Sequence, residues 1–78
     1  MSDPNEIRAL KASLGGAIDT AAALEALQPK VEAFDERGDV SQEDLDELAR
    51  VTSAHAIASA ALRGLVNTMI ARRSAPTA

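Results

Sequence analysis

The sequence predicts an all-α protein that folds as an antiparallel helical hairpin. Alanine supplies 17 of the 78 residues, against a single Phe and no Trp or Tyr, which is typical of closely packed helices. Apolar residues recur in steps of three and four along two long segments. Strong stop and start signals at 37–41 separate these segments, so we expect one helix on each side of a tight turn, within a single domain over 1–78.

The first helix is expected over about 4–36. Asp3 can cap the amides of the first turn, and Pro4 suits the first helical position. An apolar seam follows at Ile7, Leu10, Leu14, Ala17, Ala21, Leu24 and Val31. Gly15-Gly16 weakens a helix by about 1 kcal/mol per glycine, whereas Pro29 removes an amide and clashes with the preceding turn. We therefore predict that either site can kink or break the helix, with Pro29 favoured.

The turn is expected at 37–41 and the second helix over about 42–72, followed by a frayed tail at 74–78. Gly38 suits a left-handed C-terminal cap, and Ser41 suits an N-cap that faces Asp44 three residues later. The second helix has its own seam, again in threes and fours, at Leu48, Val51, His55, Ala58, Leu62, Leu65 and Met69. Folding the chain at the turn pairs the two seams at positions that sum to 79, so that Leu10 meets Met69 and Leu24 meets His55.

A further apolar surface is predicted on the second helix, outside its seam. It consists of Ile57, flanked by Ala54 and Ala61, and of Val66 and Ile70 towards the end. Two helices cannot enclose a core, so we expect this surface to bind a partner, either a second copy in an antiparallel four-helix bundle or another protein. The alternative is a break in the first helix that lets the pieces fold into a three-helix monomer covering Ile57.

Charge is distributed unevenly along the hairpin. The formal net charge of −4 repels phosphate backbones, so we expect no direct binding to nucleic acid. Eight acids lie between Glu32 and Glu47 with only Arg37 among them, which places an acidic tip at the turn. We define the acidic tip by Asp35, Glu36, Asp39, Glu43, Asp46 and Glu47. It predicts a solvated surface or electrostatic docking onto a basic partner.

The remaining sequence signals indicate where the protein acts. The start of the chain lacks a basic and apolar leader, and the least charged stretch, 51–71, holds His55, Arg63 and Asn67, which are costly in lipid. We therefore expect no membrane partner. The absence of Cys fits a reducing cytoplasm. A cytoplasmic location, or a place in the virion if the chain is encoded by a phage, is the prediction.

Metal and cofactor sites are not predicted. His55 is the sole histidine and has no Cys to join it, whereas zinc needs three or four ligands. We expect a partly buried imidazole bonded to a Ser or a carbonyl. The segment around Gly38 resembles part of a calcium loop, but Ala33 and Arg37 stand where oxygen ligands belong.

The leading hypothesis is a non-enzymatic interaction or structural protein. It would assemble through its Ala/Leu-rich helix faces as a homo-oligomer or as a small component of a larger complex, such as a phage particle. No nucleophile has a neighbouring base, and the polar groups are too few for a composite active site across a dimer, so we predict no enzymatic activity. The alternative is a small acidic inhibitor or adaptor that docks the acidic tip onto a basic surface of an enzyme or nucleic-acid-binding protein.

Overall fold

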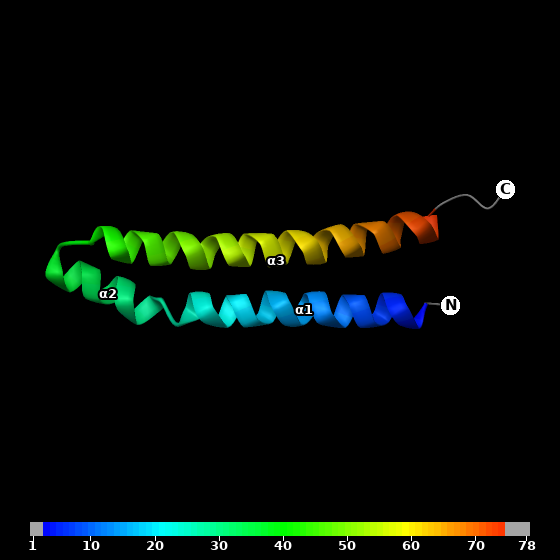
Figure 1. Ribbon diagram of the computed structural model, residues 1–78, viewed down its shortest axis with the longest axis horizontal. Coiled ribbons are helices and arrows are strands. Elements are labelled where there is room, and N and C mark those ends of the chain that lie inside the picture. The colour runs from blue at the N-terminus through cyan, green and yellow to red at the C-terminus, as the bar shows by residue number, and fades with distance from the viewer. Residues whose placement is uncertain (1–2, 75–78) are drawn as a thin grey trace.

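A computed structural model describes residues 3–74 and gives three helices: α1 (Pro4–Glu25), α2 (Gln28–Arg37) and α3 (Gln42–Ser74). The described residues contain no strand, so the all-α class is confirmed. The molecule is a rod of 63 × 19 × 16 Å. Helices α1 and α2 together form one bent arm, and α3 runs back along it (Figure 1).

The bend lies at Ala26 and Leu27, just before the proline that the sequence marks as a breaker. Pro29 stands in the first turn of α2, where its missing amide costs nothing. In a continuous helix its ring would clash with the carbonyl four residues earlier, that of Glu25, and α1 ends at this residue. The Leu27 amide instead donates to the carbonyl of Leu24 (3.0 Å). Gly15 and Gly16, by contrast, lie inside α1, which continues through them.

Both long helices begin with side-chain caps. In α1 the Asn5 amide donates to Oδ1 of Asp3 (2.9 Å). Before α3, the Asp44 amide donates to Oγ of Ser41 (3.1 Å), and the Ser41 amide donates to Oδ2 of Asp44 (3.2 Å). This reciprocal pair is a capping box. Helix α3 ends at Ser74, two residues beyond the expected end; the rest of the expected frayed tail lies outside the described residues.

The turn between α2 and α3 depends on Gly38. Its φ of 71° is left-handed, and its amide donates to the carbonyl of Phe34 (2.8 Å) and so closes the end of α2. The Arg37 guanidinium lies over the Phe34 ring, 5.3 Å from its centroid. The turn residues at 38–41 then reverse the chain direction into α3 (Figure 1).

The contact between α1 and α3 uses the expected seam of α3 and part of the expected seam of the first helix. All seven α3 seam residues, from Leu48 to Met69, are half-buried. Four residues of the other predicted seam are half-buried as expected, namely Leu10, Ala17, Ala21 and Leu24. Ile7, Leu14 and Val31 are exposed instead, and the polar residues Glu6, Ser13 and Thr20 are half-buried. The half-buried side of α1 is thus rotated from the predicted seam, because a search for apolar periodicity misses polar positions.

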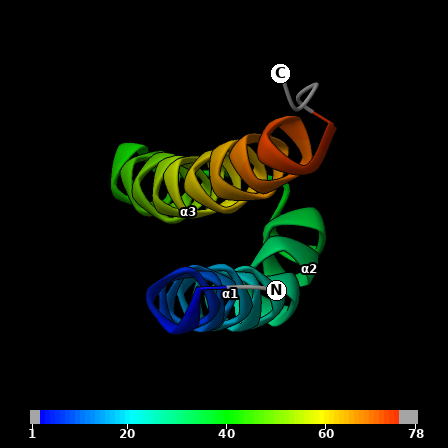
Figure 2. The same ribbon diagram turned by 90° about the vertical axis from the view of Figure 1, so that its right-hand side faces the viewer.

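The hairpin encloses almost no core. Leu27, at the bend, is the one fully buried residue in the part of the chain that the structure describes, with 7% of its surface exposed. Viewed along the rod, α2 lies beside the gap between α1 and α3 without covering a whole face of either (Figure 2). The alternative of a three-helix monomer that covers Ile57 is wrong: α1 does break from α2, but Ile57 remains 72% exposed.

Candidate interaction surfaces

The predicted interface residues form two surfaces on different sides of α3. Ala54, Ile57 and Ala61 are spaced by three and four residues and share one side of the helix. Val66 follows Ile57 by nine residues, which is two and a half turns, so the two side chains leave α3 in nearly opposite directions. Ile70 lies one turn beyond Val66, on the side of Val66.

The first surface, on the side of Ile57, is flat and made of small residues. Ala54, Ile57 and Ala61 are all exposed, and Gly64 continues the same side. A Cβ added to Gly64 would meet nothing within 4 Å, so this side of α3 is open within the single chain. A flat helix side with small residues suits close approach by another helix.

The second surface is a groove between the two arms at the open end of the hairpin. It has a volume of about 280 Å³ and is lined by Leu10, Val66, Met69, Ile70 and Arg73. The pairing of Leu10 with Met69, expected from the sequence, is consistent with their joint lining of this groove. Ile7 and Leu14 lie one turn to either side of Leu10 and are exposed, so they extend the apolar surface along α1. Apolar periodicity predicts these two residues in the seam, and this prediction is wrong, since both are exposed.

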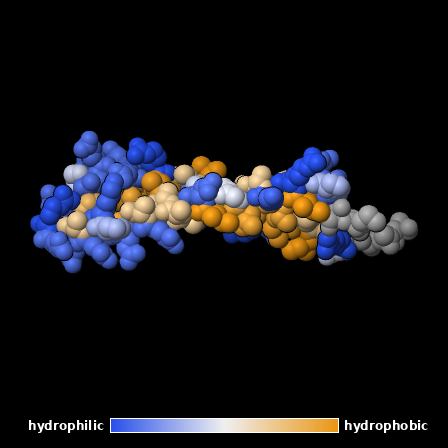
Figure 3. Space-filling view, turned by 90° about the horizontal axis from the view of Figure 1, so that it is seen from below, coloured by the Kyte–Doolittle hydropathy of each residue, from blue (hydrophilic) through white to orange (hydrophobic). Residues whose placement is uncertain are grey.

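The acidic tip is where the sequence predicted it. Hydrophilic residues gather over the turn end of the rod, and hydrophobic residues appear along the rest of the face seen in Figure 3. Glu43, Asp46 and Glu47 surround a shallow hollow of about 430 Å³, together with Asp44 and Arg50. Asp35, Glu36 and Asp39 are exposed at the end of α2 and in the turn.

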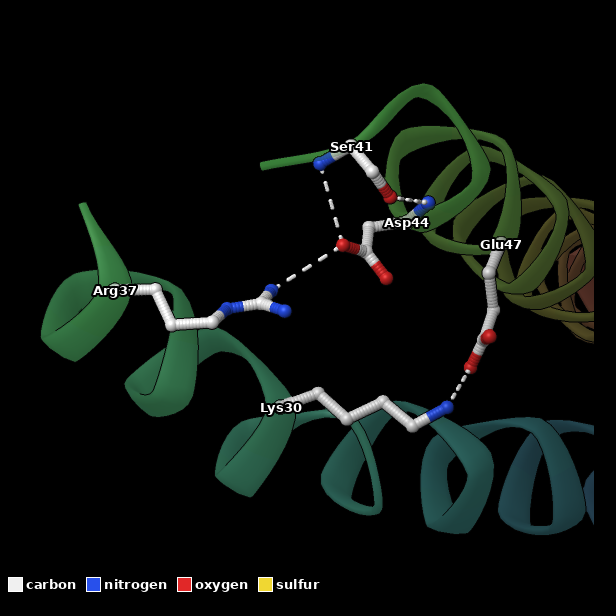
Figure 4. A network of polar contacts seen from close by, with 5 residues as sticks. All are labelled: Lys30, Arg37, Ser41, Asp44 and Glu47. Carbon is white, nitrogen blue, oxygen red and sulfur yellow. Dashed lines mark hydrogen bonds and ion pairs between the residues drawn. The ribbon is translucent and has the colours of Figure 1, made fainter. Parts of the chain in front are cut away.

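Part of this negative charge is used within the chain. Nζ of Lys30 in α2 contacts Oε1 of Glu47 in α3 (2.5 Å), and Nη2 of Arg37 contacts Oδ2 of Asp44 (3.4 Å), as Figure 4 shows. These two ion pairs link both ends of α2, at Lys30 and at Arg37, to the first two turns of α3. In the range 3–74, ion pairs within 4.0 Å do not involve Asp35, Glu36, Asp39 or Glu43. The tip therefore keeps acids that are available to a partner.

The capping hydrogen bonds lower the pKa of Asp44 below its ordinary value. The largest cause is the hydrogen bonding from Ser41, followed by the positive charge of Arg37, while partial desolvation opposes them. Asp44 thus remains ionised to a lower pH than a free aspartate. The hydrogen bond from the Ser41 amide to this carboxylate therefore supports the start of α3 at every pH at which Asp44 is charged.

His55 is held by hydroxyl groups inside the hairpin. The Thr20 hydroxyl donates to the carbonyl of Gly16 (2.9 Å), so its oxygen accepts from Nδ1 of His55 (2.9 Å). Nε2 is then the unprotonated nitrogen and accepts from the Ser59 hydroxyl (3.3 Å). A half-buried imidazole with both nitrogens bonded matches the expected structural role. The predicted register pairs His55 with Leu24. The imidazole instead bonds Thr20, which lies one turn before Leu24, because a ring nitrogen needs a polar partner.

Within 3–74, no helix combines the length and apolar character needed to span a membrane. The same range has no group of three or more His, Cys, Asp or Glu side chains arranged to hold a metal ion. Comparison with family models, with curated proteins and with solved structures finds no match to this chain.

Proposed function

We propose that the chain is a non-enzymatic assembly or structural protein that works by binding a second copy of itself, or another protein of a larger complex, through its Ala/Leu-rich helix faces. In this function the hairpin is one half of a helical bundle, and the partner supplies the helices that cover its apolar surfaces.

The observation that supports this proposal is the large exposed surface. A compact monomer of 8.1 kDa exposes about 4,500 Å². The hairpin exposes 6042 Å², roughly 1,500 Å² more. A standard protein interface buries about 800 Å² per partner, so the excess corresponds to about two such contacts per chain.

The exposed surface is also apolar in places where a monomer would be polar. Aliphatic side chains that are about half exposed or more occur on α1 at Ile7, Leu14 and Ile18 and on α3 at Ile57 and Ile70. Scattered exposed aliphatic residues are common in monomers, but within residues 3–74 they outnumber the single buried one, Leu27. The balance favours burial by a partner.

The experiment that tests self-assembly is sedimentation velocity over a range of protein concentration, with thermal unfolding at the same concentrations. We expect a mass that is a multiple of 8.1 kDa and a Tm that rises with concentration, because association stabilises the folded state by mass action. A chain that stays monomeric throughout, with a constant Tm, contradicts self-assembly. Capture from a native lysate or particle then tests the larger complex.

A second candidate function is that of an acidic inhibitor or adaptor, which would dock the acidic tip onto a basic surface. The observation in its favour is the set of exposed acids without ion pairs, Asp35, Glu36, Asp39 and Glu43. Binding of this kind weakens with salt. A captured partner whose affinity is insensitive to salt and to charge reversal at Asp39, Glu43 and Asp46 contradicts this function.

A further inference from the structure

A stripe of exposed residues runs along α3 on the side of Ile57. Its members are spaced by three or four residues, so they share one side of the helix. They are Glu43, Asp46, Arg50, Ala54, Ile57, Ala61, Gly64, Thr68 and Arg72, and all are exposed. We call this set the α3 stripe. It begins with two acids followed by Arg50, passes through small and apolar residues and Thr68, and ends with Arg72.

The residues of the α3 stripe are spaced nearly symmetrically about Ile57, so each faces a counterpart when a second stripe is turned end to end. Glu43 lies 14 residues before Ile57 and Arg72 lies 15 residues after it. Asp46 lies 11 residues before Ile57 and Thr68 lies 11 residues after it. At 1.5 Å per residue, the two charged ends are therefore each about 21 to 23 Å from the centre.

We propose that the α3 stripe binds the same stripe of a second copy of this chain, turned end to end, with Ile57 close to the two-fold axis. This inference rests on the proposed function, assembly through helix faces, and specifies its partner and orientation. Such a contact is isologous, so each pairing occurs twice.

The pairings that follow are chemically matched. Glu43 faces Arg72 of the second copy, which places opposite charges together at both ends; Arg72 also contacts Glu6 of its own chain through Nη1, so Glu43 would share this guanidinium. Asp46 faces Thr68, a small polar residue whose hydroxyl donates to the Gly64 carbonyl of its own helix (2.9 Å), so this pairing places no like charges together but adds no hydrogen bond. Arg50 faces Gly64, where an added Cβ would meet nothing and space is left for the long side chain. A parallel copy would instead place Glu43 against Glu43 and Arg72 against Arg72.

The centre of the stripe allows the two α3 helices to approach closely. Ala54 faces Ala61 of the second copy on each side of the axis, and Ile57 packs at the centre, where the single chain leaves 72% of it exposed. Overlap from Glu43 to Arg72 covers about 45 Å along a rod that is 19 Å by 16 Å in section. A helix with its side chains is about 10 to 12 Å wide, so one side of α3 offers roughly 450 to 540 Å² per copy, a little over half of a standard interface.

The groove at the open end is a weaker site for a second copy. Leu10, Val66, Met69 and Ile70 all belong to the half of the rod that is remote from the turn. A parallel copy seated there brings two acidic tips side by side, and an end-to-end copy overlaps only the open halves. The α3 stripe, in contrast, is centred on Ile57, midway along α3.

Single cysteines test this orientation, because the chain has none of its own. A disulfide needs Cα atoms about 4.4 to 6.8 Å apart. Under mild oxidation we expect Ile57→Cys to form a covalent dimer. A mixture of Ala54→Cys and Ala61→Cys should form a mixed dimer, in excess over the dimers of either variant alone. Val66→Cys, on the opposite side of α3, is the matched control and should form little.

The outcomes separate this inference from the proposed function. A protein that sediments as an oligomer but is cross-linked through Val66→Cys and not through Ile57→Cys overturns the inference and leaves the function standing. Ala54→Cys that links to itself better than to Ala61→Cys indicates a parallel contact and also overturns it. A chain that stays monomeric at all concentrations overturns the inference together with the self-assembly form of the proposed function, and leaves only binding to another protein.

A second variant measures the contact without a covalent bond. Ile57→Asp changes a residue that is exposed in the single chain, so each copy should fold, as far-ultraviolet circular dichroism at low concentration can verify. Two buried isoleucines are lost per dimer, and we expect the dimer Kd to rise by about 100-fold or more in sedimentation equilibrium. An unchanged Kd overturns the inference.

Discussion

Leu27→Ala is the substitution that should most weaken the fold of a single hairpin. Leu27 is 7% exposed and lies at the bend between α1 and α2, where its carbonyl also accepts from the Val31 amide (3.0 Å). Truncating a buried Leu to Ala costs about 2 to 5 kcal/mol, and the low end applies where neighbours can collapse into the space. In a rod this thin we therefore expect a loss of about 2 to 3 kcal/mol.

Leu14→Ala is the matched control, because it removes the same atoms from a position that is 47% exposed. About half of the effect at Leu27 is expected there, roughly 1 kcal/mol. A domain of this size shifts its Tm by about 4 to 8 °C per kcal/mol. Thermal unfolding followed by circular dichroism should thus give a drop of about 8 to 24 °C for Leu27→Ala and clearly less for Leu14→Ala.

Thermal unfolding of both variants should be measured at the lowest protein concentration that gives a signal, because association contributes least to the Tm there. If both variants lose the same Tm there, Leu27 is not the anchor of the bend, and the reasoning from burial fails. If the loss for Leu14→Ala grows as concentration rises while that for Leu27→Ala does not, Leu14 is buried in the assembly.

Three further predictions concern the backbone and the cap. Gly38→Ala should lower the free energy of unfolding by about 1 kcal/mol in a urea titration, because φ is 71° there although space for a Cβ is free. Gly15→Ala should instead raise it by about 0.5 to 1 kcal/mol, since this glycine is helical and open; a loss of stability would indicate a hidden contact. The lowered pKa of Asp44 stabilises the fold above the ordinary aspartate value, and this contribution is lost as pH falls through the folded pKa. Ser41→Ala should therefore flatten the dependence of Tm on pH below about pH 4, and an unaltered profile would contradict that assignment.

The sequence predicted the features that depend on local chemistry. The left-handed glycine at Gly38 and the capping box of Ser41 and Asp44 follow from residue types a few positions apart. The α3 seam also agrees in every position, because six of its seven residues are apolar and recur in steps of three and four. Pro29 indicated the break, and its clash with the residue four positions earlier sets the end of α1 at Glu25.

The seam of α1 could not be obtained in the same way. Its half-buried positions include Glu6, Ser13 and Thr20, which a search for apolar periodicity discards. Glu6 lies there because the Arg72 guanidinium of α3 contacts its carboxylate, and Thr20 because it bonds His55. These choices depend on the partner helix. The placement of Ile57 and Val66 on opposite sides of α3, on the other hand, could be predicted from the sequence, since nine residues are two and a half helical turns.

Polar contacts explain how a chain with one fully buried residue in its described part keeps a single arrangement of its arms. Lys30 and Glu47 contact near the tip, Thr20 and His55 near the middle, and Glu6 and Arg72 at the open end. A slip of one arm by a turn would break all three at once, so these contacts select the register. Exposed ion pairs contribute only about 0 to 1 kcal/mol each, however, which is too little to replace a core. The register is therefore encoded within the chain, whereas in the proposed function a partner bound to the exposed helix faces supplies much of the apolar burial that stabilises the protein.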